Sequence, residues 1–174
     1  MMRAISRSLL VAGLMALGTA AQAQDGGLAT YKNDRYGYSI SYPAAQFVAL
    51  PVVTDEARQF ISTDGKARLL VGTLTNTDGR ALAEYRDFLL RESYAGAKVD
   101  YAPLKGNWFV LSGDRNGMTF YERVTFTCGG RSINSWAMVF PTADKATWDR
   151  VIEQVHRGYR IADGKCAPAS VATK

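Results

Sequence analysis

The sequence predicts a single α+β domain, and three observations support this fold class. Extended runs with alternating apolar residues are joined by short connectors rich in Gly, Asn and Asp, which favours antiparallel pairing of neighbouring strands. Only two segments, at about 80–93 and 142–159, have the apolar spacing of an amphipathic helix. Strands and helices do not alternate as they do in parallel βαβ folds, and no repeat or long linker divides the chain.

The first 23 residues have the pattern of a secretory signal peptide. A basic start with two arginines precedes a short apolar stretch at 9–17, and Ala21–Ala23 supplies the small residues that a signal peptidase reads. The apolar stretch is shorter than the roughly 20 residues needed to span a bilayer. We therefore expect cleavage between Ala23 and Gln24, a periplasmic or secreted location, and no membrane span in the mature chain.

The remainder is expected to form one domain, residues 24–161, followed by a polar tail, residues 162–174. The formal net charge is +5, of which two positive charges belong to the signal peptide, and the other basic residues are scattered among acids. A nucleic-acid-binding domain would carry a concentrated basic patch. We expect no nucleic-acid partner.

The first part of this domain predicts two hairpins. An alternation of aromatic and small residues over 36–42 is typical of a half-buried strand, which we pair with a strand at 29–32. A second pair of strands, at 58–63 and 66–75, flanks Asp64-Gly65, a dipeptide that suits a tight turn.

The rest predicts a helix, a meander of strands and a closing helix. The first helix, at about 80–93, has one apolar stripe, and Asn76–Gly79 supplies residues that favour a helix start. The second helix follows Pro141, with Thr142 as its N-cap. The four strands expected between the two helices are residues 98–104, 108–113, 118–128 and 131–140.

The two cysteines, Cys128 and Cys166, predict one disulfide. An even number of cysteines in an exported protein favours bonding, and the spacing matches no C-x-x-C redox motif. In the chain-entropy account, closing a loop of about 40 residues stabilises the fold by roughly 4 kcal/mol. The alternative is two free thiols, one of them buried in the sheet.

The chain resembles PsbP-like domains. The resemblance rests on the tyrosine-rich entry Tyr31–Pro43, on Trp108–Gly113 and on Phe120–Glu122, and it extends over about 29–159. It implies an antiparallel sheet of about six or seven strands sandwiched between helices, and a binding or accessory role through contact with other macromolecules. The matched positions are strand, turn and core residues, so no functional residue is carried over.

The residue types needed for catalysis are sparse. His156 is the only histidine, which excludes a metal site built on several imidazoles of one chain. No serine lies in a G-x-S-x-G elbow, and no glycine-rich loop leads into a helix to hold a phosphate. We therefore expect no enzymatic activity, no metal and no cofactor.

Glu122 is the acid of greatest interest. On strand alternation its side chain lies on the same face as Phe120 and Val124, where a carboxylate needs a partner or a raised pKa. It could line a ligand cleft. The alternative is a strand-end position that faces water or pairs with Arg123 or Arg131.

The aromatic residues of the strands form a second candidate surface. Most are expected to pack in the core, but an exposed subset could contact a partner, because Tyr and Trp are favoured at interfaces. Together with Glu122, the candidate ligand or partner surface contains Tyr121, Trp136 and Trp108.

These observations favour an exported, non-enzymatic binding or accessory module that contacts an envelope or periplasmic protein. The first alternative is a carrier of a small apolar molecule or lipid, with a cleft between the sheet and a helix. The second alternative is a hydrolase that uses His156.

Overall fold

The computed structural model describes residues 27–162 and Cys166. The expected signal peptide and its cleavage site lie outside these residues, as does most of the expected tail. Within the described part, no helix has the length and apolar content needed to cross a membrane.

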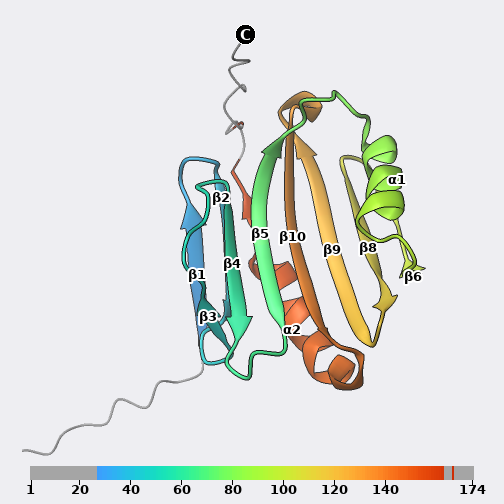
Figure 1. The fold of residues 1–174 in the computed structure, drawn as a ribbon. Coiled ribbons are helices and arrows are strands. Elements are labelled where there is room, and N and C mark those ends of the chain that lie inside the picture. Colours follow the sequence, from blue (N-terminus) through green and yellow to red (C-terminus); the bar gives the residue numbers. More distant parts are fainter. Residues whose placement is uncertain (1–26, 163–165, 167–174) are drawn as a thin grey trace, which may run out of the picture.

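The larger of two sheets has eight strands, in the order β3-β4-β5-β10-β9-β8-β6, with the short β7 also paired to β8 (Figure 1). All its neighbouring strands are antiparallel. The strands are β3 Phe47–Ala49, β4 Ala57–Ser62, β5 Arg68–Thr75, β6 Lys98–Tyr101, β7 Leu104–Lys105, β8 Trp108–Arg115, β9 Met118–Thr127 and β10 Ser132–Pro141. After β5 the chain forms a helix and the far half of the sheet, and β10 then returns to lie between β9 and β5.

A three-stranded sheet packs beside this large sheet. It consists of β1 Leu28–Asn33, β2 Tyr38–Pro43 and β11 Arg160–Ile161, with β2 in the middle. The closing helix, α2 Lys145–Gly158, packs against β2 and β10. These elements cover one face of the large sheet, which is the rear face in Figure 1.

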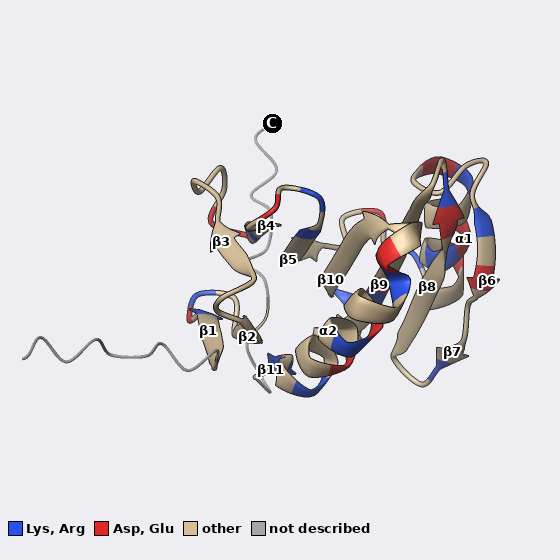
Figure 2. Cartoon of the chain, turned by 90° about the horizontal axis from the view of Figure 1, so that it is seen from below, with Lys and Arg blue, Asp and Glu red and all other residues tan. Residues whose placement is uncertain are grey.

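The other helix, α1 Leu82–Glu92, lies on the front face, over β8 and β9 (Figure 1). Strand alternation separates the two cores. On β10, Trp136, Met138 and Phe140 join the core beneath α2, whereas Ile133 joins the core beneath α1. Acidic and basic residues are interspersed over both helices and the β6 edge, as Figure 2 shows.

The α+β class and the PsbP-like architecture expected from the sequence are confirmed, including both hairpins and the β8-β9-β10 meander. The position of one helix start is wrong. A 3-10 turn, Thr142–Asp144, precedes α2, so the helix begins at Lys145 and Thr142 is not its N-cap. The Thr142 hydroxyl instead lies 3.0 Å from that of Thr119 on β9, which anchors the turn to the sheet.

The loop before α1 uses its polar residues for tertiary contacts. The amide of Asn76 donates to the carbonyl oxygens of Arg80 and Gly130, which ties this loop to the β9–β10 connection. The helix itself begins after Ala81, whose backbone N–H donates to the Glu84 carboxylate at 2.8 Å.

The disulfide between Cys128 and Cys166 is present, with the two Cα atoms 5.7 Å apart. Cys128 has a φ of 57° and opens the 3-10 turn Cys128–Gly130 that follows β9. The bond therefore joins a residue beyond the short strand β11 to the end of a central strand.

Candidate functional site

Helix α1 leaves about half of the front sheet face uncovered. It packs over β8 and β9, whereas no helix lies in front of β5 or β4 in Figure 1. A groove of about 400 Å³ occupies this open area, and we call it the sheet groove. Its floor consists of front-face residues of three adjacent strands: Ala57 and Gln59 on β4, Leu70, Gly72 and Leu74 on β5, and Ser135 and Ala137 on β10.

Small residues in register across the sheet produce this hollow. Gly72 lies opposite Ala57 on one side and Ser135 on the other, and Ala137 lies between Leu70 and Glu122. A Cβ atom at Gly72 would lie 3.1 Å from that of Ala57. Larger side chains at these positions would fill the groove, so its depth depends directly on their size.

Glu122 forms the inner wall of the groove, on the side of α1. One of its carboxylate oxygens accepts a hydrogen bond of 2.6 Å from the hydroxyl of Tyr94, and the Tyr94 ring stacks on Phe120 with centroids 4.2 Å apart. Burial raises the pKa of Glu122 above its ordinary value of 4.5, although the Tyr94 hydrogen bond acts in the opposite direction. Burial, reinforced by the neighbouring Glu122 charge, likewise raises the pKa of Tyr94.

The alternative partners considered for Glu122 are engaged elsewhere. The Arg123 guanidinium lies 4.5 Å from the ring centroid of Trp108 on the opposite face. Arg131 donates to the carbonyl oxygen of Cys128. The partner of Glu122 is therefore a neutral hydroxyl, which leaves the negative charge of the ionised carboxylate without a counter-ion in the described part of the chain.

We expect Glu122→Gln to make folding less dependent on pH. Because the pKa of Glu122 is higher in the folded than in the unfolded protein, its ionisation opposes folding as pH rises from about 4.5 through the raised folded value. The variant keeps an acceptor for Tyr94, so its free energy of unfolding should exceed that of wild type at neutral pH. The difference should disappear at and below pH 4.5.

Urea unfolding from pH 4 to pH 8 measures this difference. Glu92→Gln, at an exposed position that ends α1, is the matched control and should follow wild type throughout. A wild-type protein that is as stable as Glu122→Gln at neutral pH would contradict the assignment of a destabilising charge.

The floor of the groove includes an exposed apolar residue, Leu74, which is 53% exposed. The loop before β4 carries two more exposed apolar residues, Val52 at 63% and Val53 at 85%, which are not part of the groove lining. Glu56, at the end of that loop, lines the groove and accepts a hydrogen bond of 2.9 Å from Tyr36, which lowers its pKa. The groove thus combines an apolar floor with a glutamate, Glu56 or Glu122, at each side.

The structure does not bring the four expected surface residues together. Glu122 lies on the front face, whereas Tyr121, Trp136 and Trp108 lie on or beside the rear face. Trp136 is fully buried and stacks on Tyr121, with ring centroids 5.0 Å apart. It cannot itself contact a partner, so Glu122 is the member of the set that lines the sheet groove.

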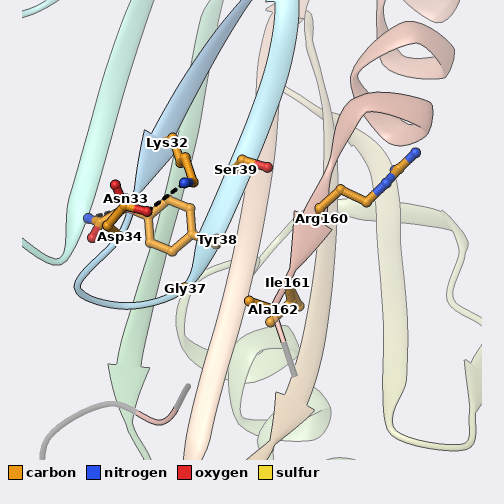
Figure 3. A pocket seen from close by; sticks show the side chains of 9 residues that line it. All are labelled: Lys32, Asn33, Asp34, Gly37, Tyr38, Ser39, Arg160, Ile161 and Ala162. Carbon is orange, nitrogen blue, oxygen red and sulfur yellow. Dashed lines mark hydrogen bonds and ion pairs between the residues drawn. The ribbon is translucent and has the colours of Figure 1, made fainter. Parts of the chain in front are cut away.

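A hollow of about 270 Å³ between the β1–β2 turn and β11 is a less suitable site (Figure 3). Lys32 pairs with Asp34 at 2.8 Å, and the Asn33 amide donates to the Asp55 carbonyl oxygen at 2.7 Å. The side chain of Arg160 extends away from the hairpin in this view. The first of these contacts lies within the hairpin and the second joins it to the loop before β4, so both polar groups already have partners in the protein.

The expected catalytic candidates are not assembled into a reactive set. His156 is exposed near the end of α2, and its ring contacts Trp136 at 6.5 Å between centroids. Both cysteines are in the disulfide, so neither supplies a thiolate. Residues 27–162 and 166 contain no group of three or more His, Cys, Asp or Glu side chains able to hold a metal ion.

The fold matches solved structures of low sequence identity. The structure is similar to cyanobacterial PsbP (CyanoP) of a Synechocystis species, with a TM-score of 0.60 and 15% identity over 84% of this chain and 99% of that one. The protein has a PsbP-like fold. It is also similar to the Ran-binding protein Mog1p of Saccharomyces cerevisiae, with a TM-score of 0.55 and 12% identity over 79% of this chain and 96% of that one. The sequence matches no protein-family model and no curated protein.

At these identities the likeness establishes the PsbP-like fold and assigns no residue a role. Sequence reasoning missed most of the sheet groove, including Gly72, Ser135 and Ala137. These small residues alternate with buried residues along β5 and β10, and that alternation could have indicated the groove. Small side chains on the same face of two paired strands leave a depression in the surface of the sheet. The sequence offered no way to tell whether a helix covers them.

Proposed function

We propose that this PsbP-like protein is an exported, non-enzymatic binding module that docks an envelope or periplasmic protein on the sheet groove. The observation that carries the proposal is the part of the front sheet face that α1 leaves uncovered. There the exposed Leu74 and other apolar residues together form the floor of the sheet groove. Contiguous apolar surface that stays in water is typical of interaction sites. The signal peptide expected at residues 1–23 supports export, and the name of Mog1p gives a protein-binding role to one protein of this fold.

The chemistry of the groove indicates what the partner presents. The floor is wide and apolar, so an extended or helical segment can lay its apolar side chains on Leu70 and Leu74. Glu122 and Glu56 line the two sides, and a basic side chain in the segment would neutralise either carboxylate. The segment expected is therefore apolar with at least one Lys or Arg.

Leu74→Lys tests the docking surface. Burial of a leucine side chain is worth roughly 1.5–3 kcal/mol, so the change should weaken partner binding by at least about tenfold. Leu28→Lys is the matched control, because Leu28 is also a strand leucine and is 54% exposed against 53% for Leu74. A photo-crosslinking residue at position 74, introduced in cells that export the protein, should capture a discrete partner that position 28 does not capture.

The purified partner then gives the affinities of both variants by titration calorimetry. Filling the groove with Ala137→Leu should also weaken binding, since Ala137 lies on the floor between Leu70 and Glu122. Equal capture at positions 28 and 74, or unchanged affinity of Leu74→Lys, would exclude the groove as the docking surface.

A carrier of a small apolar molecule is the second candidate. The observation that favours it is a carboxylic acid, Glu122, at the wall of a groove of about 400 Å³ with an apolar floor. Such a combination is typical of sites that hold an apolar body and fix one polar end. Native mass spectrometry of the freshly isolated protein should then show a bound molecule that Ala137→Leu loses, and a ligand-free spectrum would exclude the carrier.

A further inference from the structure

A second hollow, on the rear face, is lined mainly by hydrogen-bond donors and positive charges. It has a volume of about 230 Å³ and lies where β9 meets the end of α2 and β11. We call it the arginine pocket. It is lined by Arg123, Thr125, His156, Tyr159, Arg160 and Ile161.

Two buried donors, one on the lining of this pocket and one beside it, have no acceptor among the residues that the structure describes. Tyr159 is 9% exposed and its hydroxyl has no hydrogen-bond partner. The indole nitrogen of the fully buried Trp136 also has none, and the two rings lie 6.4 Å apart between centroids. An unpaired buried donor destabilises the fold, so such donors point to an acceptor that enters the pocket.

The charges around the pocket have one sign. Arg123 is held against the Trp108 ring and forms no ion pair with any described residue. None of the described residues that line the hollow is acidic. The Arg160 guanidinium donates to the carbonyl oxygens of Arg157 and Tyr159, and it thereby satisfies backbone acceptors at the end of α2.

Arg123 is preorganised to bind an anion. The Trp108 ring fixes its guanidinium 4.5 Å from the ring centroid, so little side-chain freedom is lost on binding. A guanidinium forms paired, charge-assisted hydrogen bonds with carboxylate and phosphate oxygens. Tyr159 and Thr125 lie on the same lining, and their hydroxyl groups, of which that of Tyr159 is buried, are neutral donors.

We propose that the arginine pocket binds a small oxyanion group, a carboxylate or a phosphate. Arg123 supplies the charge, and Tyr159 fixes the anion from the buried side. The pocket lies on the opposite face of the sheet from the sheet groove, since Arg123 and Glu122 are successive residues of β9. The site is thus independent of the proposed docking function, and variants of one should leave the other unchanged.

Titration with inorganic phosphate and with acetate, at constant ionic strength maintained by sodium chloride, tests the site. The indole N–H signal of Trp136, observed by nuclear magnetic resonance, should shift in a saturable way with one or both anions. Arg123→Gln should weaken binding by about tenfold or more, because a charge-assisted hydrogen bond is lost. Tyr159→Phe should weaken it severalfold without destabilising the fold, since the hydroxyl has no partner within residues 27–162 and 166.

Arg58→Gln is the matched control. Arg58 also lies against an aromatic ring, that of Tyr31 at 5.9 Å, but it does not line the pocket. Its titration should match that of wild type. Any one of three results would overturn the proposal. These are no saturable shift with either anion, an equal shift with sodium chloride alone, and unchanged anion binding in Arg123→Gln.

Vesicles distinguish a free anion from a lipid headgroup. If the bound phosphate belongs to a lipid headgroup, the protein should sediment with phosphatidylglycerol vesicles but not with phosphatidylcholine vesicles. Arg123→Gln should then lose this sedimentation. Saturable binding of inorganic phosphate or acetate without sedimentation would assign a free solute. Failure of both arms would overturn the site.

Discussion

Trp136→Ala is expected to lower the free energy of unfolding by about 3–5 kcal/mol. Trp136 is fully buried at the middle of β10, between the sheet and α2. Its ring stacks on Tyr121 and contacts Tyr159 and His156. Truncation would remove these contacts and leave a cavity that strands on both sides prevent from closing.

Trp108→Ala is the control for this prediction, because it makes the same chemical change at a half-buried position. Its loss should be clearly smaller, since water replaces part of the lost contact. Urea unfolding followed by circular dichroism measures both variants. Equal losses would contradict the assignment of Trp136 to the core and would restore it as a candidate for a partner surface.

Loss of the disulfide is expected to lower the free energy of unfolding by roughly 4 kcal/mol. The bond between Cys128 and Cys166 closes a loop that contains β10, α2 and β11. Without it the unfolded chain gains conformational freedom, and β11 is held by its short pairing with β2 and by the packing of Ile161 against the core. The double variant Cys128→Ser with Cys166→Ser should therefore unfold at a lower urea concentration than the oxidised wild type.

Reduction separates the effect of the bond from that of the serine side chains. Dithiothreitol should lower the stability of wild type to that of the double variant and should leave the double variant unchanged. If reduction leaves the unfolding curve of wild type in place, the bond restrains only the segment after β11 and does not stabilise the domain.

Local sequence patterns predicted most of the fold. The turn at Asp64-Gly65 and the alternation over 36–42 specify hairpins because neighbouring strands need only a short connection. The helical stripe of α1 and strands β8, β9 and β10 follow from periodicity in the same way, whereas the single strand expected at 98–104 is divided into β6 and β7. The N-cap of α2 was predicted wrongly, because the hydroxyl of Thr142 bonds to Thr119, a residue far along the chain.

The candidate site was predicted only in part. Strand alternation placed Glu122 on an apolar face, and the structure shows it there beside Phe120. Its partner is Tyr94, which lies 28 residues away, and no sequence spacing indicates that contact. Likewise, alternation placed aromatic residues on one face of each strand, but it could not show that Trp136 is covered by α2 while Trp108 is only half covered.

The sequence by itself determined the two helices, the longer strands and the face to which their residues point, and it favoured a bond between the two cysteines over two free thiols. The tertiary structure alone decided what covers each face. Helix α1 packs over β8 and β9 and leaves the small residues Gly72 and Ala137 of the sheet groove open to water. The physical reason is that periodicity reflects local backbone geometry, whereas coverage depends on contacts between elements distant in the chain.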